Sequence, residues 1–253
     1  MLDVIAIPAL RDNYIWLVRH EGSAIVIDPG DAEPVIDFLN RERLALAAIL
    51  VTHHHADHQG GIAALVAREG AEVYGPATES ITGLSQPLSG GESIRVGPLR
   101  QSFAVLHVPG HTLGHLAYFS EDVLFCGDTL FGAGCGRLFE GTPEQMFVSL
   151  SHLAALPDAT RVFPAHEYTQ SNLQFARAVE PRNQEIQCRI KQVDDLRARG
   201  LPTLPTTIGV EKATNPFLRC AAPEVIEAAR TRSGGAGSPV EVFAAIREWK
   251  NSF

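Results

Sequence analysis

The histidines of this chain are concentrated in one short segment that follows an apolar run. Four of the ten histidines lie between positions 53 and 58, where the sequence reads HHHADH after the apolar residues 47–51. Imidazole and carboxylate groups hold Zn²⁺ and similar divalent ions at neutral pH, and packing several of them into one turn is costly unless a cation compensates. Because α/β proteins place ligands at the carboxyl ends of strands, this position favours a metal site over a solvated histidine-rich loop.

Three further ligand-type side chains follow other apolar runs. His111 comes after the run 102–108, Asp128 after 122–125 and His166 after 160–163, each beside a glycine or a proline-containing turn. The candidate donors are more numerous than the four ligands of one tetrahedral ion. Because a carboxylate can bridge two ions, two metal ions that share Asp128 fit this number of donors. The seven candidate ligands are His53, His55, Asp57, His58, His111, Asp128 and His166.

The remaining histidines are expected to lie outside the ligand set. His54 should point away from its neighbours if the segment is locally extended, and His107 lies inside an apolar strand-like run. His115 follows His111 by four residues, but Pro109, Gly110 and Gly114 argue against the helix that would make them a ligand pair. We therefore expect His115 to contact a ligand from behind or to belong to the core, and His152 to lie on a helix surface.

The elements that must position these residues are short strands and helices in alternation. Helices are expected at 34–42, 62–69 and 143–156, where apolar residues recur at intervals of three and four. After about position 168 the sequence predicts helices almost exclusively, joined by a loop over 201–217. The strands expected from apolar runs that end in Gly, Pro or Asp are 2–8, 14–20, 23–30, 46–53, 71–76, 99–110, 116–120, 122–128 and 160–166.

Composition excludes several classes of protein. The chain has 253 residues, 45% hydrophobic and 20% charged, which is typical of a folded globular protein rather than a disordered one. A net charge of −8 argues against a nucleic-acid partner, because phosphate contacts need clustered Lys and Arg. No run of 18 apolar residues occurs, and Asp3, Arg11 and Asp12 interrupt any signal-peptide core. We therefore expect a cytoplasmic monomer without a membrane partner.

Residues 52–58 match the motif THxHxDH, which is the signature of the metallo-β-lactamase superfamily, and His111, Asp128 and His166 follow in the family's order. The chain resembles this superfamily over its first two thirds. The resemblance implies an α/β fold, namely an αββα sandwich with two facing β-sheets, helices outside and the metals at one edge. In dinuclear members it implies two ligand sets bridged by Asp128: His53, His55 and His111 for one ion, and Asp57, His58 and His166 for the other.

Within that superfamily the chain is similar to the glyoxalase II family of hydroxyacylglutathione hydrolases. The matching stretches cover nearly the whole chain, and include Asp12-Asn13-Tyr14, PGHTLGH, CGDTLF, GCGRLFEGT, AHEYT, TNPFLR and the terminal REWK. The resemblance implies a metal-binding domain over 1–168 and a helical glutathione-binding domain over 169–253. It implies that the substrate is held by Arg137, Phe139, Tyr168, Arg247 and Lys250. Two of these depart from the animal-type pattern, which has Lys at position 137 and Tyr at position 139.

The implied enzyme is a dinuclear thioester hydrolase. It would convert S-(2-hydroxyacyl)glutathione, such as S-D-lactoylglutathione, to glutathione and D-lactate, the second step of methylglyoxal detoxification. Asp57 and Asp128 would orient a hydroxide held between two divalent ions, with zinc favoured and iron or manganese as alternatives. Rival hypotheses are a glutathione persulfide dioxygenase with one metal, a lactonase or β-lactamase, and a non-catalytic metal-binding module.

Overall fold

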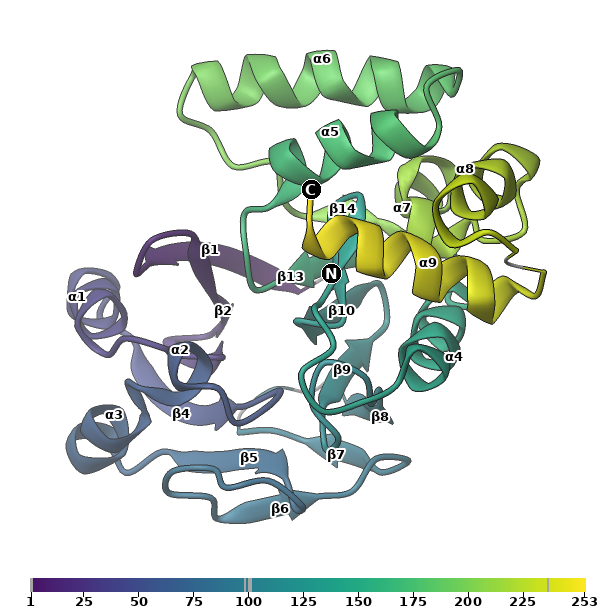
Figure 1. Cartoon of the computed structure of the whole chain (residues 1–253). Helices are drawn as coiled ribbons and strands as arrows, with labels where there is room; N and C mark the ends of the chain where they lie inside the picture. The colour runs from purple at the N-terminus through teal and green to yellow at the C-terminus, as the bar shows by residue number, and fades with distance from the viewer. Residues whose placement is uncertain (1, 98, 100–101, 236) are drawn as a thin grey trace. The chain divides into compact units, whose positions relative to one another are not determined.

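A computed structural model describes residues 2–97, 99, 102–235 and 237–253 (Figure 1). The chain divides into two compact units. Unit 1 contains residues 1–107 and 114–127, and unit 2 contains residues 108–113 and 128–253.

Unit 1 contains a mixed six-stranded sheet in the order β1-β2-β3-β4-β5-β6. The first three strands are antiparallel neighbours, whereas β3 to β6 pair in parallel, so the connections between those strands must cross over the sheet. Its strands are β1 Asp3–Ala9, β2 Asn13–His20, β3 Ser23–Ile27, β4 Ala45–Leu50, β5 Glu72–Pro76 and β6 Gln86–Leu88.

Helices in the crossovers cover one side of this sheet. Helix α1 (Glu33–Glu42) joins β3 to β4, and α2 (Ala56–Gln59) and α3 (Ile62–Glu69) lie between β4 and β5 (Figure 1). The core consists of helix residues packed on strand residues, including Val35, Leu39, Ile62 and Leu65 against Ile15, Leu17, Val26 and Ile49. Burial of these side chains holds α1 and α3 against the sheet that contains β3 and β4.

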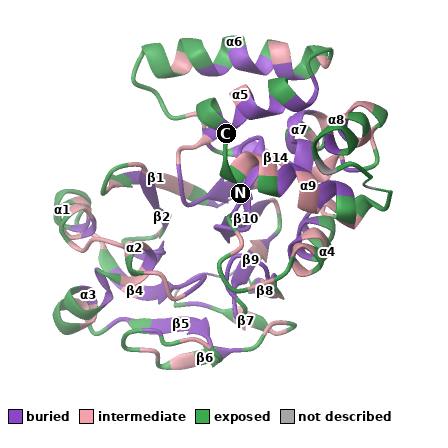
Figure 2. Ribbon diagram, in the orientation of Figure 1, coloured by how far each residue is buried: buried purple, intermediate pink, exposed green. Residues whose placement is uncertain are grey.

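Unit 1 also contains four antiparallel strands paired in the order β7-β8-β9-β10. They are β7 Ser93–Arg95, β8 Ser102–His107, β9 Leu116–Ser120 and β10 Val123–Gly127, and every residue of β10 is buried (Figure 2). The Tyr118 hydroxyl donates to the carbonyl oxygen of Val51 at 2.7 Å, which ties β9 to the segment that leaves β4.

Unit 2 is mainly helical, as the sequence predicts. It includes the hairpin β11–β12 (Leu130–Phe131 and Gly134–Cys135) and the pair β13–β14 (Arg161–Pro164 and Thr206–Thr207). Its helices are α4 Pro143–Ala154, α5 Thr169–Val179, α6 Gln184–Ala198, α7 Ile208–Thr214, η1 Pro216–Leu218, α8 Pro223–Ser233 and α9 Pro239–Asn251. None of the helices formed by the described residues is long and apolar enough to cross a membrane.

The structure departs from the sequence expectation in several regions. The short elements α2, β6, β7, β11 and β12 were not expected. The segment 201–217, expected to be a loop, contains β14, α7 and part of η1, because the Thr207 hydroxyl accepts a hydrogen bond from the Val210 amide and begins a helix. The strand expected over 99–110 covers only Ser102–His107, and positions 100 and 101 lie outside the described residues. The sequence through 108–110 contains Pro109 and Gly110, which end the strand.

The start of α9 provides a test of helix capping. The Ser238 side chain accepts a hydrogen bond from the Glu241 amide, and the Glu241 carboxylate accepts one from the Ser238 amide. This bond from the Ser238 backbone, with a second from Gly237, lowers the pKa of Glu241. We predict that Ser238→Ala lowers the free energy of unfolding by about 1 kcal/mol in urea denaturation. Ser252→Ala at the other end of α9 is the control, and an equal loss there would contradict the prediction.

Candidate metal centre and substrate site

The carboxylate of Asp28 organises the ligand segment of unit 1. Asp28 follows β3, is 4% exposed and has a left-handed backbone with φ of 53°. Its Oδ1 accepts a hydrogen bond from the Thr52 amide at 2.7 Å, and its Oδ2 accepts one from the Thr52 hydroxyl at 2.8 Å. The Nδ1 atom of His58 lies 3.1 Å from the same Oδ2. Because β3 and β4 are parallel neighbours, their carboxyl ends meet at one edge, where this carboxylate joins them.

The hydrogen bonds of Thr52 determine which ring nitrogen of His53 carries the proton. The Thr52 hydroxyl gives its hydrogen to Asp28, so it accepts one from Nδ1 of His53 at 3.0 Å. In the His53 ring Nε2 therefore keeps a lone pair, which is the state that a metal ion requires. The Nδ1 atom of His58 lies 3.1 Å from the Asp28 carboxylate.

Asp57 is held by residues from two neighbouring segments. The side-chain amide of Asn13 donates to Asp57 Oδ2 at 3.0 Å. A Cβ atom on Gly30 would lie 1.9 Å from the Asp57 carbonyl oxygen, so only glycine permits this approach. Neither Asp28 nor Gly30 was expected from the sequence to belong to the site, although the run Ile27-Asp28-Pro29-Gly30 at the end of an apolar strand is a signal that could have revealed them.

Two histidines close to these residues, His54 and His115, are not in the candidate ligand set. The Nδ1 atom of His54 is 3.0 Å from Glu79 Oε2, and the His54 amide donates to the same oxygen at 2.7 Å. The ring of His115 is fully buried and stacks on the ring of His53, with centroids 4.7 Å apart. His115 therefore packs behind a candidate ligand.

Unit 2 brings the candidate ligands His111 and His166 to the carboxylate of a third, Asp128. The Nε2 atom of His111 lies 3.4 Å from Asp128 Oδ2, and the Nε2 atom of His166 lies 3.4 Å from Asp128 Oδ1. His111 donates from Nδ1 to the Arg137 carbonyl oxygen at 2.7 Å, which leaves Nε2 as the lone-pair nitrogen. A Cβ atom on Gly136 would lie 1.9 Å from the Asp128 carbonyl oxygen, so this loop also depends on glycine.

The donor spacing within each unit fits divalent metal ions. Two donors that each lie about 2.0–2.1 Å from one tetrahedral ion are roughly 3.3 Å apart. In unit 1 the distance is 3.0 Å between His53 Nε2 and His55 Nδ1, and 3.5 Å between His58 Nε2 and Asp57 Oδ2. In unit 2 both distances to Asp128 are 3.4 Å, and each uses a different carboxylate oxygen. A carboxylate that presents one oxygen to each of two histidines is suited to bridging two ions.

Three of the expected substrate residues lie close to the ligands of unit 2. The Tyr168 ring stacks on the His166 ring at 4.7 Å, with the two planes inclined by only 3°. Phe139 is 60% exposed, and its ring meets the edge of His111 at 5.2 Å. Arg137 is exposed, and in sequence it lies between the hairpin β11–β12 and Phe139.

The two expected substrate residues of α9 differ from each other in environment. Arg247 is only 7% exposed, and it donates to the Cys135 carbonyl oxygen at 2.8 Å and to Asn251 at 3.3 Å. The half-buried Lys250 amino group lies 5.3 Å from the centre of the Phe175 ring. Burial, reinforced by the charge of Arg247, lowers the pKa of Lys250. The Arg247 guanidinium thus forms its hydrogen bonds with other residues of unit 2.

Comparisons with known proteins cover the whole chain. Residues 9–166 match the family model described as "Metallo-beta-lactamase superfamily", and residues 167–253 match the one described as "Hydroxyacylglutathione hydrolase C-terminus". A solved structure, "Crystal structure of TTHA1623 in a di-iron-bound form", is similar with a TM-score of 0.60 and 29% identity, over 85% of this chain and 100% of that one.

Two curated relatives extend the match over the full length. A "Hydroxyacylglutathione hydrolase" of Dechloromonas aromatica is 56% identical over 267 residues, and one of Nitrosomonas eutropha is 50% identical over 254 residues, in each case covering 100% of both chains. The chain therefore has the metallo-β-lactamase fold and belongs to the hydroxyacylglutathione hydrolase (glyoxalase II) family within the metallo-β-lactamase superfamily.

Proposed function

We propose that this hydrolase cleaves the thioester of S-(2-hydroxyacyl)glutathione, such as S-D-lactoylglutathione, to give glutathione and a 2-hydroxy acid. The full-length similarity to hydroxyacylglutathione hydrolases supports this substrate. The observation that carries the chemistry is the carboxylate of Asp128, which directs one oxygen to His111 and the other to His166. The persulfide dioxygenase alternative is not favoured, because the C-terminal match is to the hydrolase family.

The superfamily and the clustered His and Asp side chains indicate a dinuclear metal site. The proposed ligands are His53, His55 and His111 for one ion and Asp57, His58 and His166 for the other, with Asp128 as the bridge. Zinc is the proposed metal, with iron and manganese as alternatives, and the di-iron form of a similar structure makes iron worth testing. When bound, such ions would lower the pKa of water and polarise the thioester carbonyl.

The protein's own contribution is to fix the groups around the reacting atoms. Asp57 and Asp128 are the proposed catalytic carboxylates, and Asn13 holds Asp57 by a hydrogen bond to the oxygen nearest His58. Each would orient the attacking water without itself forming a covalent bond to the substrate. The leaving thiolate needs little protonation, because thiols have a pKa of about 8.5.

Substrate recognition requires positive charge on an acidic protein. Arg137 and Lys250 are proposed to attract the glutathione carboxylates, with Tyr168 and Phe139 beside them and Arg247 supporting the site. Lys250 is charged below its lowered pKa, so binding should weaken as alkaline pH removes that charge. We propose that 169–253 acts as the glutathione-binding domain beside the metal-binding domain 1–168, in a cytoplasmic monomer.

The bridging role of Asp128 can be tested by an isosteric change. Asp128→Asn removes the charge that lets one side chain serve two cations, so we expect less than two metal ions per chain by elemental analysis. The kcat for lactoylglutathione should fall by about 100-fold or more. Asp158→Asn, at an exposed carboxylate paired with Lys212, is the control. If Asp128→Asn keeps two ions and near-normal turnover, Asp128 is not the bridge.

The role of Lys250 can be separated from that of Arg247. Lys250→Ala should raise KM for lactoylglutathione about tenfold, since charged hydrogen bonds contribute roughly 1.5–3 kcal/mol before solvent screening is considered. Hydrolysis of a small thioester without the tripeptide should change little, because Lys250 is proposed to contact the non-reacting end of the substrate. Arg247→Ala should also lower the Tm, because it breaks a buried bond to Cys135.

The exposed Lys191 on α6 supplies the control. Lys191→Ala should leave KM for both substrates unchanged. An equal loss of activity on both substrates in Lys250→Ala would show that the lysine stabilises the protein instead of recognising glutathione.

A further inference from the structure

The hairpin β11–β12 lies between Asp128 and Arg137 and contacts several groups of the proposed site. The ring of Phe131 meets the His166 ring edge-on at 5.8 Å and the Tyr168 ring at 5.2 Å. Directly after the hairpin, the carbonyl oxygen of Arg137 accepts the hydrogen bond from His111. The hairpin and the His111 hydrogen bond together hold the backbone from which the Arg137 side chain extends.

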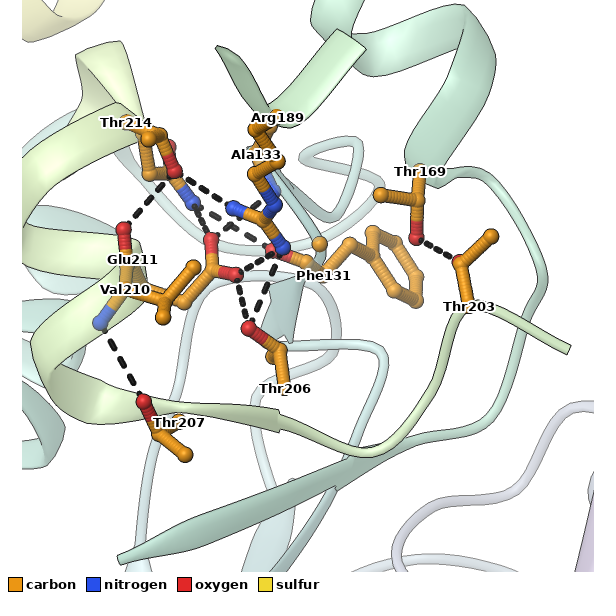
Figure 3. A network of polar contacts seen from close by, with 12 residues as sticks. Phe131, Ala133, Thr169, Arg189, Thr203, Thr206, Thr207, Val210, Glu211 and Thr214 are labelled. Atoms are coloured by element: carbon orange, nitrogen blue, oxygen red, sulfur yellow. Dashed lines mark hydrogen bonds and ion pairs between the residues drawn. The ribbon is translucent and has the colours of Figure 1, made fainter. Parts of the chain in front are cut away.

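The turn of the hairpin is held by a buried carboxylate from α7. Glu211 is 0% exposed, and its Oε2 accepts a hydrogen bond from the Ala133 amide at 2.8 Å and one from the Asn215 side chain at 3.0 Å (Figure 3). Ala133 has a φ of 53°, a left-handed conformation that a non-glycine residue rarely adopts. The bond to Glu211 stabilises this turn.

Two asparagine side chains complete the hold on the hairpin backbone. The amide of Asn215 donates to the Gly134 carbonyl oxygen at 2.9 Å and to that of Phe131 at 3.3 Å. Asn172, on α5, donates to the carbonyl oxygen of Gly132 at 3.1 Å. Glu211 in turn orients Asn215, so the carboxylate acts on the hairpin both directly and through this amide.

The other oxygen of Glu211 faces a buried cation. Oε1 accepts from Arg189 at 2.6 Å and from the Thr206 hydroxyl at 2.7 Å, and Arg189 also donates to Thr214 at 2.5 Å (Figure 3). A buried ion pair carries a large desolvation cost and is weak grounds for stability alone. Here the pair fixes one carboxylate between α6, β14 and the hairpin, which gives it a geometric role.

We propose that Glu211 is a positioning residue for glutathione recognition, acting through Ala133 and the hairpin on Arg137. The proposal rests on the proposed function of this site. Bound metal ions would themselves restrain Asp128, His111 and His166, whereas the exposed Arg137 side chain depends on the backbone that carries it. Loss of the Glu211 contact should therefore affect substrate affinity more than the chemical step.

The test is Glu211→Gln, which keeps the shape and removes one acceptor. Arg189 will attract the remaining amide oxygen, so the new NH₂ group faces the Ala133 amide and the Asn215 NH₂ group, which are donors as well. We expect KM for lactoylglutathione to rise about 3- to 10-fold, with kcat and the hydrolysis of a small thioester changed less than about twofold. These rates are measured on metal-loaded enzyme well below the Tm.

Glu180→Gln is the matched control. Glu180 is also a buried carboxylate of unit 2 in an ion pair, with Arg219 at 2.9 Å, and its pair partner contacts Lys212 rather than the hairpin. Glu180→Gln should lower the Tm but leave KM unchanged. A rise in KM in both variants, or an equal loss on both substrates in Glu211→Gln, would show that Glu211 is only structural.

A milder variant covers the case in which Glu211→Gln does not fold. Thr206→Val removes the hydroxyl bound to Glu211 and Arg189 while leaving the carboxylate in place. It should raise KM for lactoylglutathione about twofold with an unchanged small-thioester rate, and an unchanged KM would overturn the proposal. Failure of the wild-type enzyme to hydrolyse lactoylglutathione would instead reject the proposed function, so the two failures are distinguishable.

Discussion

A hydrogen bond on the Nδ1 atom of a histidine ring is the interaction on which the candidate metal centre depends. His53 donates to Thr52 and His111 to the carbonyl oxygen of Arg137, and in both rings Nε2 is left with its lone pair. A ring held in this way is in the correct tautomer and orientation before an ion arrives. The groups that accept these hydrogen bonds must therefore be positioned accurately, and the surrounding segments hold them in place.

One buried carboxylate organises the relevant region of each unit. In unit 1, Asp28 joins the ends of β3 and β4 through Thr52, and its carboxylate lies 3.1 Å from His58 Nδ1. In unit 2, Glu211 joins α6, α7, β14 and the hairpin β11–β12. Burying a carboxylate costs free energy unless several donors compensate it. Asp28 receives two hydrogen bonds from Thr52, and Glu211 receives bonds from Ala133, Arg189, Thr206 and Asn215. A misplaced segment would leave the charge uncompensated, so such carboxylates favour one arrangement of the chain over its alternatives.

The proposed substrate site combines exposed and buried cations that have different tasks. Arg137 is exposed and free of the geometric demands of a core, which suits the binding of an anionic tripeptide. Arg247 donates to the Cys135 carbonyl oxygen and lies over the Phe217 ring, so its charge is used in contacts within the protein. An acidic protein can thus attract an anion locally while its net charge of −8 remains unfavourable for polyanions.

The sequence by itself determined the order of elements and the placement of ligand-type residues after apolar runs, since strand periodicity, Gly and Pro are local signals. It also indicated the family through motifs spread along the chain, which the comparisons confirmed. Only the tertiary structure showed which groups Asp28 and Glu211 bind, because those partners lie 24 and 78 residues away in sequence. It also decided that Arg247 is buried and that 206–214 forms a strand and a helix, because burial and long-range hydrogen bonds depend on which segments pack together.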